Sequence, residues 1–171
     1  MAKVVLIGTS HKYQTARGVD ATHVDQFEHL LISLCSEHMV KGIAEEMNQD
    51  AMTERDISET VAQIVSVALE MKHQLSDPPP EIRKQLGVRG ENEIRADGWL
   101  QDWSPERIEA EVRKSHEIRE QYWLAQLKMF NSWPVLFVCG ANHSQPFSAL
   151  LHENGFEVVV AFSDWAPNSN V

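Results

Sequence analysis

Two short turns of the sequence end on a histidine and share the spacing Gly-x-x-His. The first runs from Gly8 to His11 and the second from Gly140 to His143. Each follows an apolar run, Val4–Ile7 in one case and Val135–Cys139 in the other, that is typical of a strand buried on both faces. A glycine lets the backbone turn sharply. We therefore expect both histidines at the carboxyl edge of a parallel sheet, where open α/β sheets bind ligands.

Acidic residues follow two further predicted strands. Glu45 and Glu46 come after the short run Val40–Ala44, and Asp77 comes after a weaker strand predicted at Met71–Leu75. If these strands are parallel neighbours of the first two, one crevice gathers two imidazoles and up to three carboxylates. Such a set can hold a divalent metal, or let a carboxylate orient a histidine that activates water. Adjacent side chains cannot both point into one crevice, so we expect Glu45, which is nearer the strand, with Glu46 as the alternative.

A long helix is predicted from Ser104 to Phe130, because Ser-Pro-Glu is a favourable helix start. At about 100° per residue, Arg119 falls in the middle of an apolar stripe. That stripe consists of Ile108, Val112, Trp123 and Phe130. A buried charge is costly unless it is paired, so Arg119 is predicted to reach a carboxylate or an anionic group at the sheet edge. His116, one turn earlier, is a candidate to join it, whereas Glu120 is less well placed. The alternative is that Arg119 snorkels from the end of the apolar patch.

The remaining pattern predicts a single three-layer α/β domain, with a mostly parallel central sheet flanked by helices. Amphipathic helices are predicted at residues 22–38, 53–69 and 144–153, and a last strand at residues 157–162. Residues 87–103 contain three glycines and show little periodicity, so they are predicted to be an irregular insert or a flap. The polar end, at about residues 165–171, is predicted to be a loose tail.

Composition restricts the partners and the compartment. The chain has 25 acidic and 15 basic residues, and its formal charge of -10 repels phosphate backbones and anionic membrane surfaces, so nucleic acid is not expected as a partner. No apolar run approaches the roughly 20 residues of a membrane span, and the N-terminal run is too short for a signal peptide. We therefore expect no membrane association and a cytoplasmic location. The spacings of dinucleotide, P-loop and serine-hydrolase motifs are missing from the sequence.

The order of these features resembles the superfamily that joins erythromycin esterases, TraB and pheromone-shutdown proteins, Tiki proteases and ChaN-like haem-binding proteins. The resemblance spans nearly the whole chain. It is carried by the two Gly-x-x-His turns, the acids after the second strand, and the helix that bears Arg119. It implies an α/β fold with one pocket, onto which His11, Glu45 or Glu46, Arg119 and His143 map. The chain departs from the pattern in its small size, its lack of a membrane segment and its insert at residues 87–103.

Members of this superfamily differ in activity, and the resemblance implies three types of site. Tiki-like members are similar to metal-dependent peptidases, the esterases look like histidine-assisted, water-activating hydrolases, and ChaN-like members bind haem. The leading prediction is a hydrolase of an ester or peptide bond in a small molecule or peptide. In it, His11 and His143, with Glu45 or Glu46, activate water directly or through a divalent metal, and Arg119 stabilises negative charge.

For the metal version, the predicted ligands are His11, Glu45 and His143, and the predicted ion is manganese, cobalt, iron or zinc. The chief alternative is a non-catalytic binding protein that uses the same crevice for haem, another small ligand or a regulatory partner. A third hypothesis is an interaction protein whose aromatic segment, Trp99–Trp103, docks onto another chain, either in a homo-oligomer or in a complex with a different protein.

Overall fold

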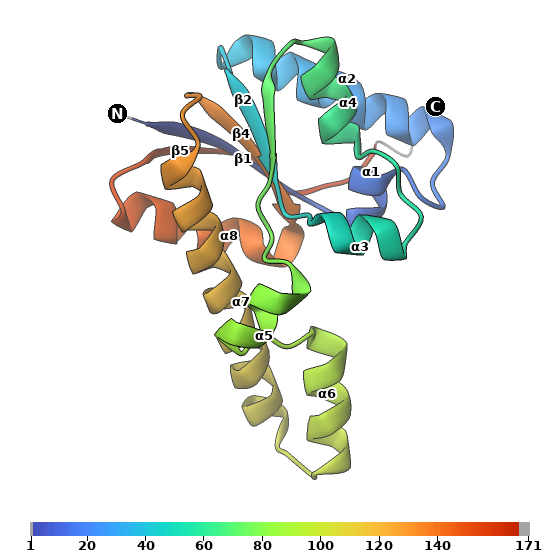
Figure 1. The fold of residues 1–171 in the computed structure, drawn as a ribbon, viewed down its shortest axis with the longest axis vertical. Helices are drawn as coiled ribbons and strands as arrows, with labels where there is room; N and C mark the ends of the chain where they lie inside the picture. The colour runs from blue at the N-terminus through green and yellow to red at the C-terminus, as the bar shows by residue number, and fades with distance from the viewer. Residues whose placement is uncertain (1, 168–171) are drawn as a thin grey trace.

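The computed structural model of the chain describes residues 2–167 and contains one sheet of five parallel strands (Figure 1). The strands lie in the order β3-β2-β4-β1-β5, and every neighbouring pair is parallel. They are β1 (Lys3–Thr9), β2 (Gly42–Glu45), β3 (Lys72–Leu75), β4 (Val135–Gly140) and β5 (Glu157–Trp165). This confirms the predicted α/β class with a parallel central sheet.

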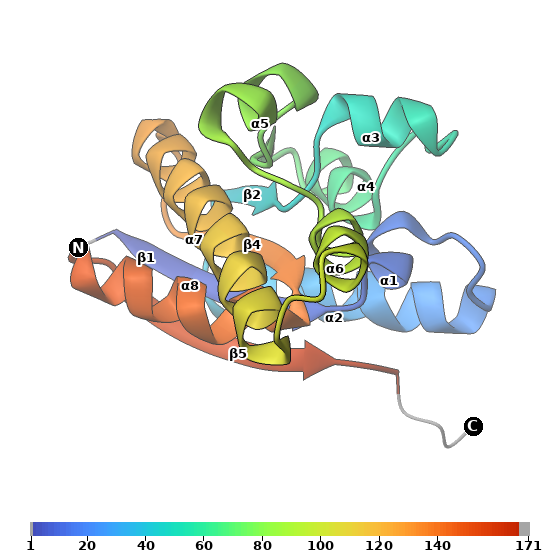
Figure 2. The ribbon, with the colours of Figure 1, turned by 90° about the horizontal axis from the view of Figure 1, so that it is seen from below.

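Helices cover both faces of the sheet, which gives the predicted three layers. The helices are α1 (His11–Thr15), α2 (Ala21–Glu37), α3 (Gln49–Glu54), α4 (Val61–Ala68), α5 (Pro80–Leu86), α6 (Glu91–Leu100), α7 (Pro105–Met129) and α8 (Ala141–Glu153). Helices α2 and α4 pack on one face, and α7 and α8 pack on the other. Strand β5 forms one edge of the sheet (Figure 2). Within residues 2–167, no helix has both the length and the apolar composition that crossing a membrane requires.

The continuous apolar runs of the strands explain this layering. In β1, Val5 and Ile7 face the side of Phe27 on α2, while Val4 and Leu6 face the side of Trp123 on α7. All of these residues are buried. Each such side chain contributes about 1.5–3 kcal/mol when it leaves water, so a strand that is apolar on both faces is stable only between two helical layers.

The connections after β1 and β4 place the two Gly-x-x-His turns side by side. Strand β1 leads to α2 on one face of the sheet, whereas β4 leads to α8 on the other face. The two strands are hydrogen-bonded neighbours, with Thr9 opposite Gly140. Adjacent strands whose connections leave in opposite directions open a crevice at their carboxyl ends, which is the usual ligand site of such sheets.

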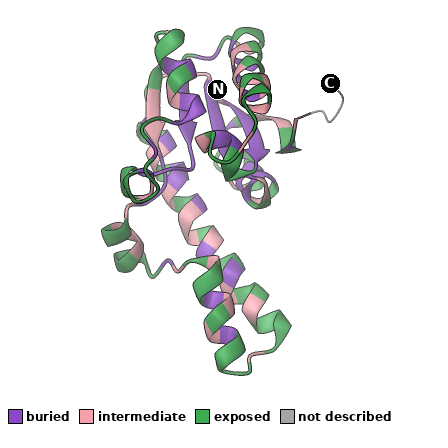
Figure 3. Cartoon of the chain, turned by 90° about the vertical axis from the view of Figure 1, so that its right-hand side faces the viewer, coloured by how far each residue is buried: buried purple, intermediate pink, exposed green. Residues whose placement is uncertain are grey.

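The segment at residues 87–103 is not irregular, which corrects the prediction of an insert without structure. It contains helix α6, which packs beside the N-terminal half of α7 and forms with it a hairpin that projects from the body (Figures 1 and 3). Ion pairs stabilise α6: Arg95 contacts Glu91 and Glu109, and Arg89 contacts Glu93. A helix held by charged pairs lacks the apolar periodicity that sequence analysis detects.

The predicted helix at residues 53–69 is two helices, α3 and α4. The break lies where Asp56 has a positive φ of 53° and Thr60 caps α4 through a capping box with Gln63. A left-handed residue followed by a cap ends one helix and begins another. The sequence predicts one continuous helix here because the apolar spacing continues across the break.

The loose tail is predicted to start at about residue 165, but this residue still belongs to strand β5. Trp165 is the last residue of β5, is buried, and packs against the rings of Tyr13 and Phe27 at centroid distances of 5.2 and 4.9 Å. A tryptophan held between two aromatic rings anchors the end of the strand. The part of this prediction that concerns residues 168–171 lies outside the described residues.

The glycine of the first turn allows strand β5 to approach β1. A Cβ atom at Gly8 would lie 2.1 Å from the carbonyl oxygen of Ser163, at a register shift between the two strands. We expect Gly8→Ala to destabilise the protein by about 1–3 kcal/mol or more, because the clash is with backbone. Urea unfolding measures this. Gly90→Ala is the control, since its Cβ would meet no atom closer than 4.0 Å; equal stability of the two variants would contradict the prediction.

Candidate active site

The carboxyl ends of β1, β2 and β4 border a cavity of about 340 Å³. Its lining brings four of the five predicted site residues together: His11, Glu46, Arg119 and His143. His11 begins α1 and His143 lies in the first turn of α8, whereas Arg119 reaches the cavity from the middle of α7. Three separate elements therefore converge on the crevice that the two Gly-x-x-His turns predicted.

Glu46 lies at the centre of this group. Its Oε2 accepts a hydrogen bond from the backbone amide of Gly140 at 2.7 Å, and its Oε1 accepts one from Nη2 of Arg119 at 2.5 Å. Nε2 of His11 and Nε2 of His143 each lie 3.7 Å from the same Oε1. A Cβ at position 140 would lie 3.2 Å from Glu46 Oε2 and 3.3 Å from His11 Nε2. A side chain at position 140 would therefore require Glu46 and His11 to shift slightly.

Arg119 joins two buried carboxylates. Its Nε and Nη2 donate to Oδ1 of Asp77 at 2.9 and 2.7 Å, in addition to the contact with Glu46. The indole of Trp123 donates to the same Asp77 oxygen at 3.2 Å, and Arg83 pairs with the other oxygen. The prediction that Arg119 reaches a carboxylate is confirmed. The guanidinium is held on several sides and stays charged, because Glu46 and Asp77 raise the pKa of Arg119 against the opposing effect of burial.

The electrostatics of the crevice keep Glu46 ionised. Burial alone would raise the pKa of this carboxyl, but Arg119, His143, His11 and the Gly140 amide together lower it to about 2. Glu46 is only 3% exposed. The crevice therefore contains a fixed negative charge that its neighbours compensate, and this charge is in place at any pH near neutrality.

The two histidines have different surroundings. The side chain of His11 is 47% exposed, and its Nδ1 lies 2.5 Å from Oε1 of the buried Gln14. The side chain of His143 is 5% exposed, and its Nδ1 lies 2.7 Å from Oε1 of Glu120. Nε2 of His143 also lies 3.4 Å from Nη1 of Arg119. His11 is thus open to a ligand, whereas His143 is enclosed.

The fifth predicted site residue, Glu45, lies elsewhere, which corrects the preference for it over Glu46. Its Oε1 accepts from the hydroxyl of Thr60 at 2.5 Å and lies 2.8 Å from Nε2 of His73, on the face covered by α4. Successive side chains of an extended chain point to opposite faces. Which of the two acids enters the crevice depends on the face of the sheet to which each side chain points, and not on its proximity to the strand in the sequence.

Helix α7 carries two site residues that sequence analysis underrated. Glu120, predicted to be less well placed, is buried against His143, and the ring of His116 lies tilted against that of His143 with centroids 4.3 Å apart. A signal was present, because His116, Glu120 and Trp123 follow one another at spacings of four and three and so share a helix face. Burial, together with the charge of Arg119, lowers the pKa of His116 to about 4, so this ring is neutral at pH 7.

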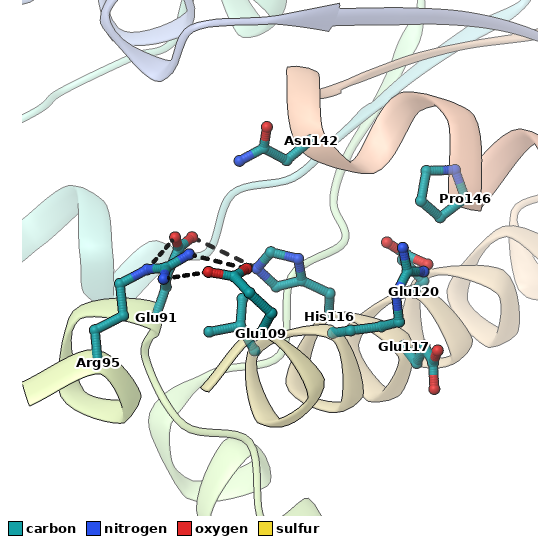
Figure 4. A pocket seen from close by; sticks show the side chains of 10 residues that line it. Glu91, Arg95, Glu109, His116, Glu117, Glu120, Asn142 and Pro146 are labelled. Carbon is teal, nitrogen blue, oxygen red and sulfur yellow. Dashed lines mark hydrogen bonds and ion pairs between the residues drawn. The ribbon is translucent and has the colours of Figure 1, made fainter. Parts of the chain in front are cut away.

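A second cavity of about 360 Å³ adjoins the first, and Glu91, His116 and Asn142 border both. Figure 4 shows its walls: Glu91 and Arg95 come from α6, His116 and Glu120 from α7, and Asn142 and Pro146 from α8. Glu120 therefore separates the enclosed His143 from this second space.

The arrangement of donors does not match the predicted metal site. No group of three or more His, Cys, Asp or Glu side chains within residues 2–167 is placed to hold a metal ion. Glu45 is on the other face, and the Glu46 oxygen nearest both histidines is already 2.5 Å from Arg119. A divalent ion bound to this oxygen at about 2.0–2.2 Å would have to displace a fixed positive charge. The residues as arranged do not fit a divalent metal, and no step proposed below depends on one.

Comparisons with known proteins identify no relative of this chain. No protein-family model, no curated protein and no solved structure gives a significant match. The fold and the side-chain geometry therefore carry the argument that follows.

The low pKa of Glu46 makes a prediction about stability. Its folded pKa of about 2 lies below its ordinary 4.5, so the ionised group contributes stability that is fully present above about pH 4.5 and is lost as the pH falls toward 2. We expect Glu46→Gln to lower the free energy of unfolding at pH 7 by on the order of 3 kcal/mol. This deficit should shrink as the pH is lowered.

Urea unfolding of both proteins between about pH 3 and pH 7 measures the deficit. Glu117→Gln, which replaces an exposed acid on α7, is the matched control and should show little difference from wild type. A deficit for Glu46→Gln that stays constant over this range would contradict the assignment.

Proposed function

We propose that the crevice is the active site of a hydrolase that cleaves an ester or peptide bond of a small molecule or peptide by direct activation of water. One observation carries the proposal. His11, whose side chain is 47% exposed, presents Nε2 to the crevice 3.7 Å from a buried carboxylate with a pKa of about 2. An accessible imidazole can act as a general base, and a nearby negative charge stabilises the imidazolium that forms when the ring takes a proton.

In the proposed reaction, His11 takes the proton from water. With the Gln14 oxygen accepting from Nδ1, the proton of the neutral ring is on Nδ1 and the lone pair is on Nε2. Nε2 accepts one proton from water as the oxygen forms a bond to the carbonyl carbon. Glu46 stabilises the imidazolium that results, and the same proton then passes to the departing alcohol or amine as the ester or amide bond breaks.

The negative charge that develops on the carbonyl oxygen has two sources of stabilisation in this proposal. Arg119 is preorganised, because Glu46 and Asp77 fix its Nη2 and Nε and leave Nη1 toward His143. The first turn of α8, whose N-cap is Gly140, adds the positive end of a helix dipole. Groups that are fixed before the reaction stabilise charge without the cost of reorganisation.

The resemblance to erythromycin esterases supports the same reaction class. In that branch, histidine-assisted activation of water is implied, and the metal-dependent branch would need a donor set that residues 2–167 lack as arranged. The site geometry and the resemblance thus favour the metal-free version of the hydrolase. The bond type remains ester or peptide, since an activated water attacks both kinds of carbonyl.

The first test of this proposal is a single substitution. We expect His11→Ala to lower kcat/KM by about 10²- to 10⁴-fold, the contribution of a positioned general base, while leaving the fold intact because the side chain is half exposed. Hydrolysis of p-nitrophenyl esters and of a fluorogenic peptide library measures activity, and circular dichroism checks the fold.

His29→Ala, which replaces an exposed histidine on α2 outside the crevice, is the matched control. Wild-type activity in His11→Ala would refute the assignment of the base. Binding of a ligand without turnover by the wild-type protein would favour the non-catalytic binding role instead.

The proposal also makes a prediction about metal removal. We expect hydrolysis to survive dialysis against EDTA within about twofold, because water is activated by the His11 imidazole and charge is stabilised by Arg119. Plasma mass spectrometry of the wild-type protein and of the His11→Ala, His143→Ala double variant provides the companion measurement. Activity that is lost in EDTA and restored by manganese, cobalt, iron or zinc would contradict the metal-free mechanism.

A further inference from the structure

Glu120 is a buried acid that the proposed reaction does not use directly. It is 3% exposed, and its Oε1 lies 2.7 Å from Nδ1 of His143. In the described part of the chain, its second carboxylate oxygen has no hydrogen-bond partner, and the residue borders the second cavity (Figure 4). A buried carboxylate is costly unless it is hydrogen-bonded, so its contact with His143 is the interaction that explains its presence.

The ring of His143 is already fixed in position by packing. The ring of His116 lies against it, tilted, with centroids 4.3 Å apart, and Trp123 meets it edge-on at 4.8 Å. These ring contacts hold the plane of the imidazole but do not determine which nitrogen carries the proton. A neutral imidazole has one donor and one acceptor nitrogen, and its hydrogen-bond partners select between the two forms.

Partners on both sides of His143 select the same form. The Glu120 carboxylate can only accept, so it requires a proton on Nδ1. The Arg119 guanidinium can only donate, and its Nη1 lies 3.4 Å from Nε2, so it requires the lone pair there. With the proton on Nε2 instead, two N–H groups would face each other, and Arg119 would lose a contact that holds Nη1 in the crevice.

We propose that Glu120 is a positioning residue, which fixes the proton of His143 on Nδ1 so that Nε2 accepts from Arg119 and holds the guanidinium toward the reacting carbonyl. Glu120 touches neither water nor substrate in this scheme and acts through His143. The effect on hydrolysis rests on the proposed function. The assignment of the proton does not, because it concerns the protein alone.

The test compares three replacements of Glu120. Glu120→Met fills similar space but has no acceptor, Glu120→Ala leaves room for water from the adjoining cavity, and Glu120→Gln retains an oxygen that can accept from Nδ1. ¹⁵N NMR of the imidazole nitrogens reports which nitrogen of His143 is protonated, and assignment comes from the signals lost in His143→Ala. Glu117→Ala, one turn away on α7 and bordering the same cavity, is the matched control.

We expect the wild-type and Glu117→Ala proteins to carry the proton on Nδ1 and to have equal activity. In Glu120→Met, the proton should move to Nε2 or exchange between the nitrogens, and kcat/KM should fall about 10- to 100-fold, as when a partner that orients a functional histidine is removed. Glu120→Gln should restore both the Nδ1 form and most of the activity. A merely structural role for Glu120 would alter stability without moving the proton.

The outcomes that overturn the inference are distinct from failure of the proposed function. A proton that stays on Nδ1 in Glu120→Met would refute the positioning role, whatever the activity. Should Glu120→Met not fold, Glu120→Leu, which also lacks an acceptor and leaves little room for water, decides the question. If the wild-type protein hydrolyses none of the substrates, the proposed function fails, while the NMR comparison still decides the assignment of Glu120.

Discussion

The rest of the site depends on one buried guanidinium. Arg119 lies between Glu46 and Asp77, which follow β2 and β3, and it projects from α7, which covers the opposite side of the sheet from α2 and α4. Removal of Arg119 would leave the buried Glu46 carboxylate without its cation, which typically costs about 3–5 kcal/mol. The ion pairs therefore fix the ends of two strands relative to one helix.

This constraint also determines the geometry of the crevice. Because Oε1 of Glu46 is held by Arg119, its Oε2 is free to accept from the Gly140 amide, which ties β4 to the same cluster. The approach is close enough that a side chain at position 140 would press on both Glu46 and His11. The second glycine of the two turns thus lies against the ion pair, and the surroundings of this motif depend on Glu46, which is 94 positions away in the sequence.

Sequence analysis could predict the features that follow from local pattern and general energetics. Apolar runs gave the parallel sheet, and the cost of a buried charge led from the stripe on α7 to a carboxylate partner for Arg119. It could not choose between Glu45 and Glu46, because that choice depends on which face of the chain meets α7 and which meets α4. It also missed α6, because that helix buries only Ile94 and Gly98 and so offers no apolar stripe.

The two Gly-x-x-His turns show how one local pattern gives two chemical environments. Both begin a helix at the end of a parallel strand, and the equivalence of their sequences had suggested equivalent histidines. Helix α1 ends after five residues, at a left-handed Ala16, so little protein covers His11. Helix α8 is thirteen residues long and packs beside α7, whose Glu120 and Trp123 enclose His143. The length of the following helix and the presence of a covering helix, rather than the motif itself, make one imidazole accessible to water and turn the other into a support for Arg119.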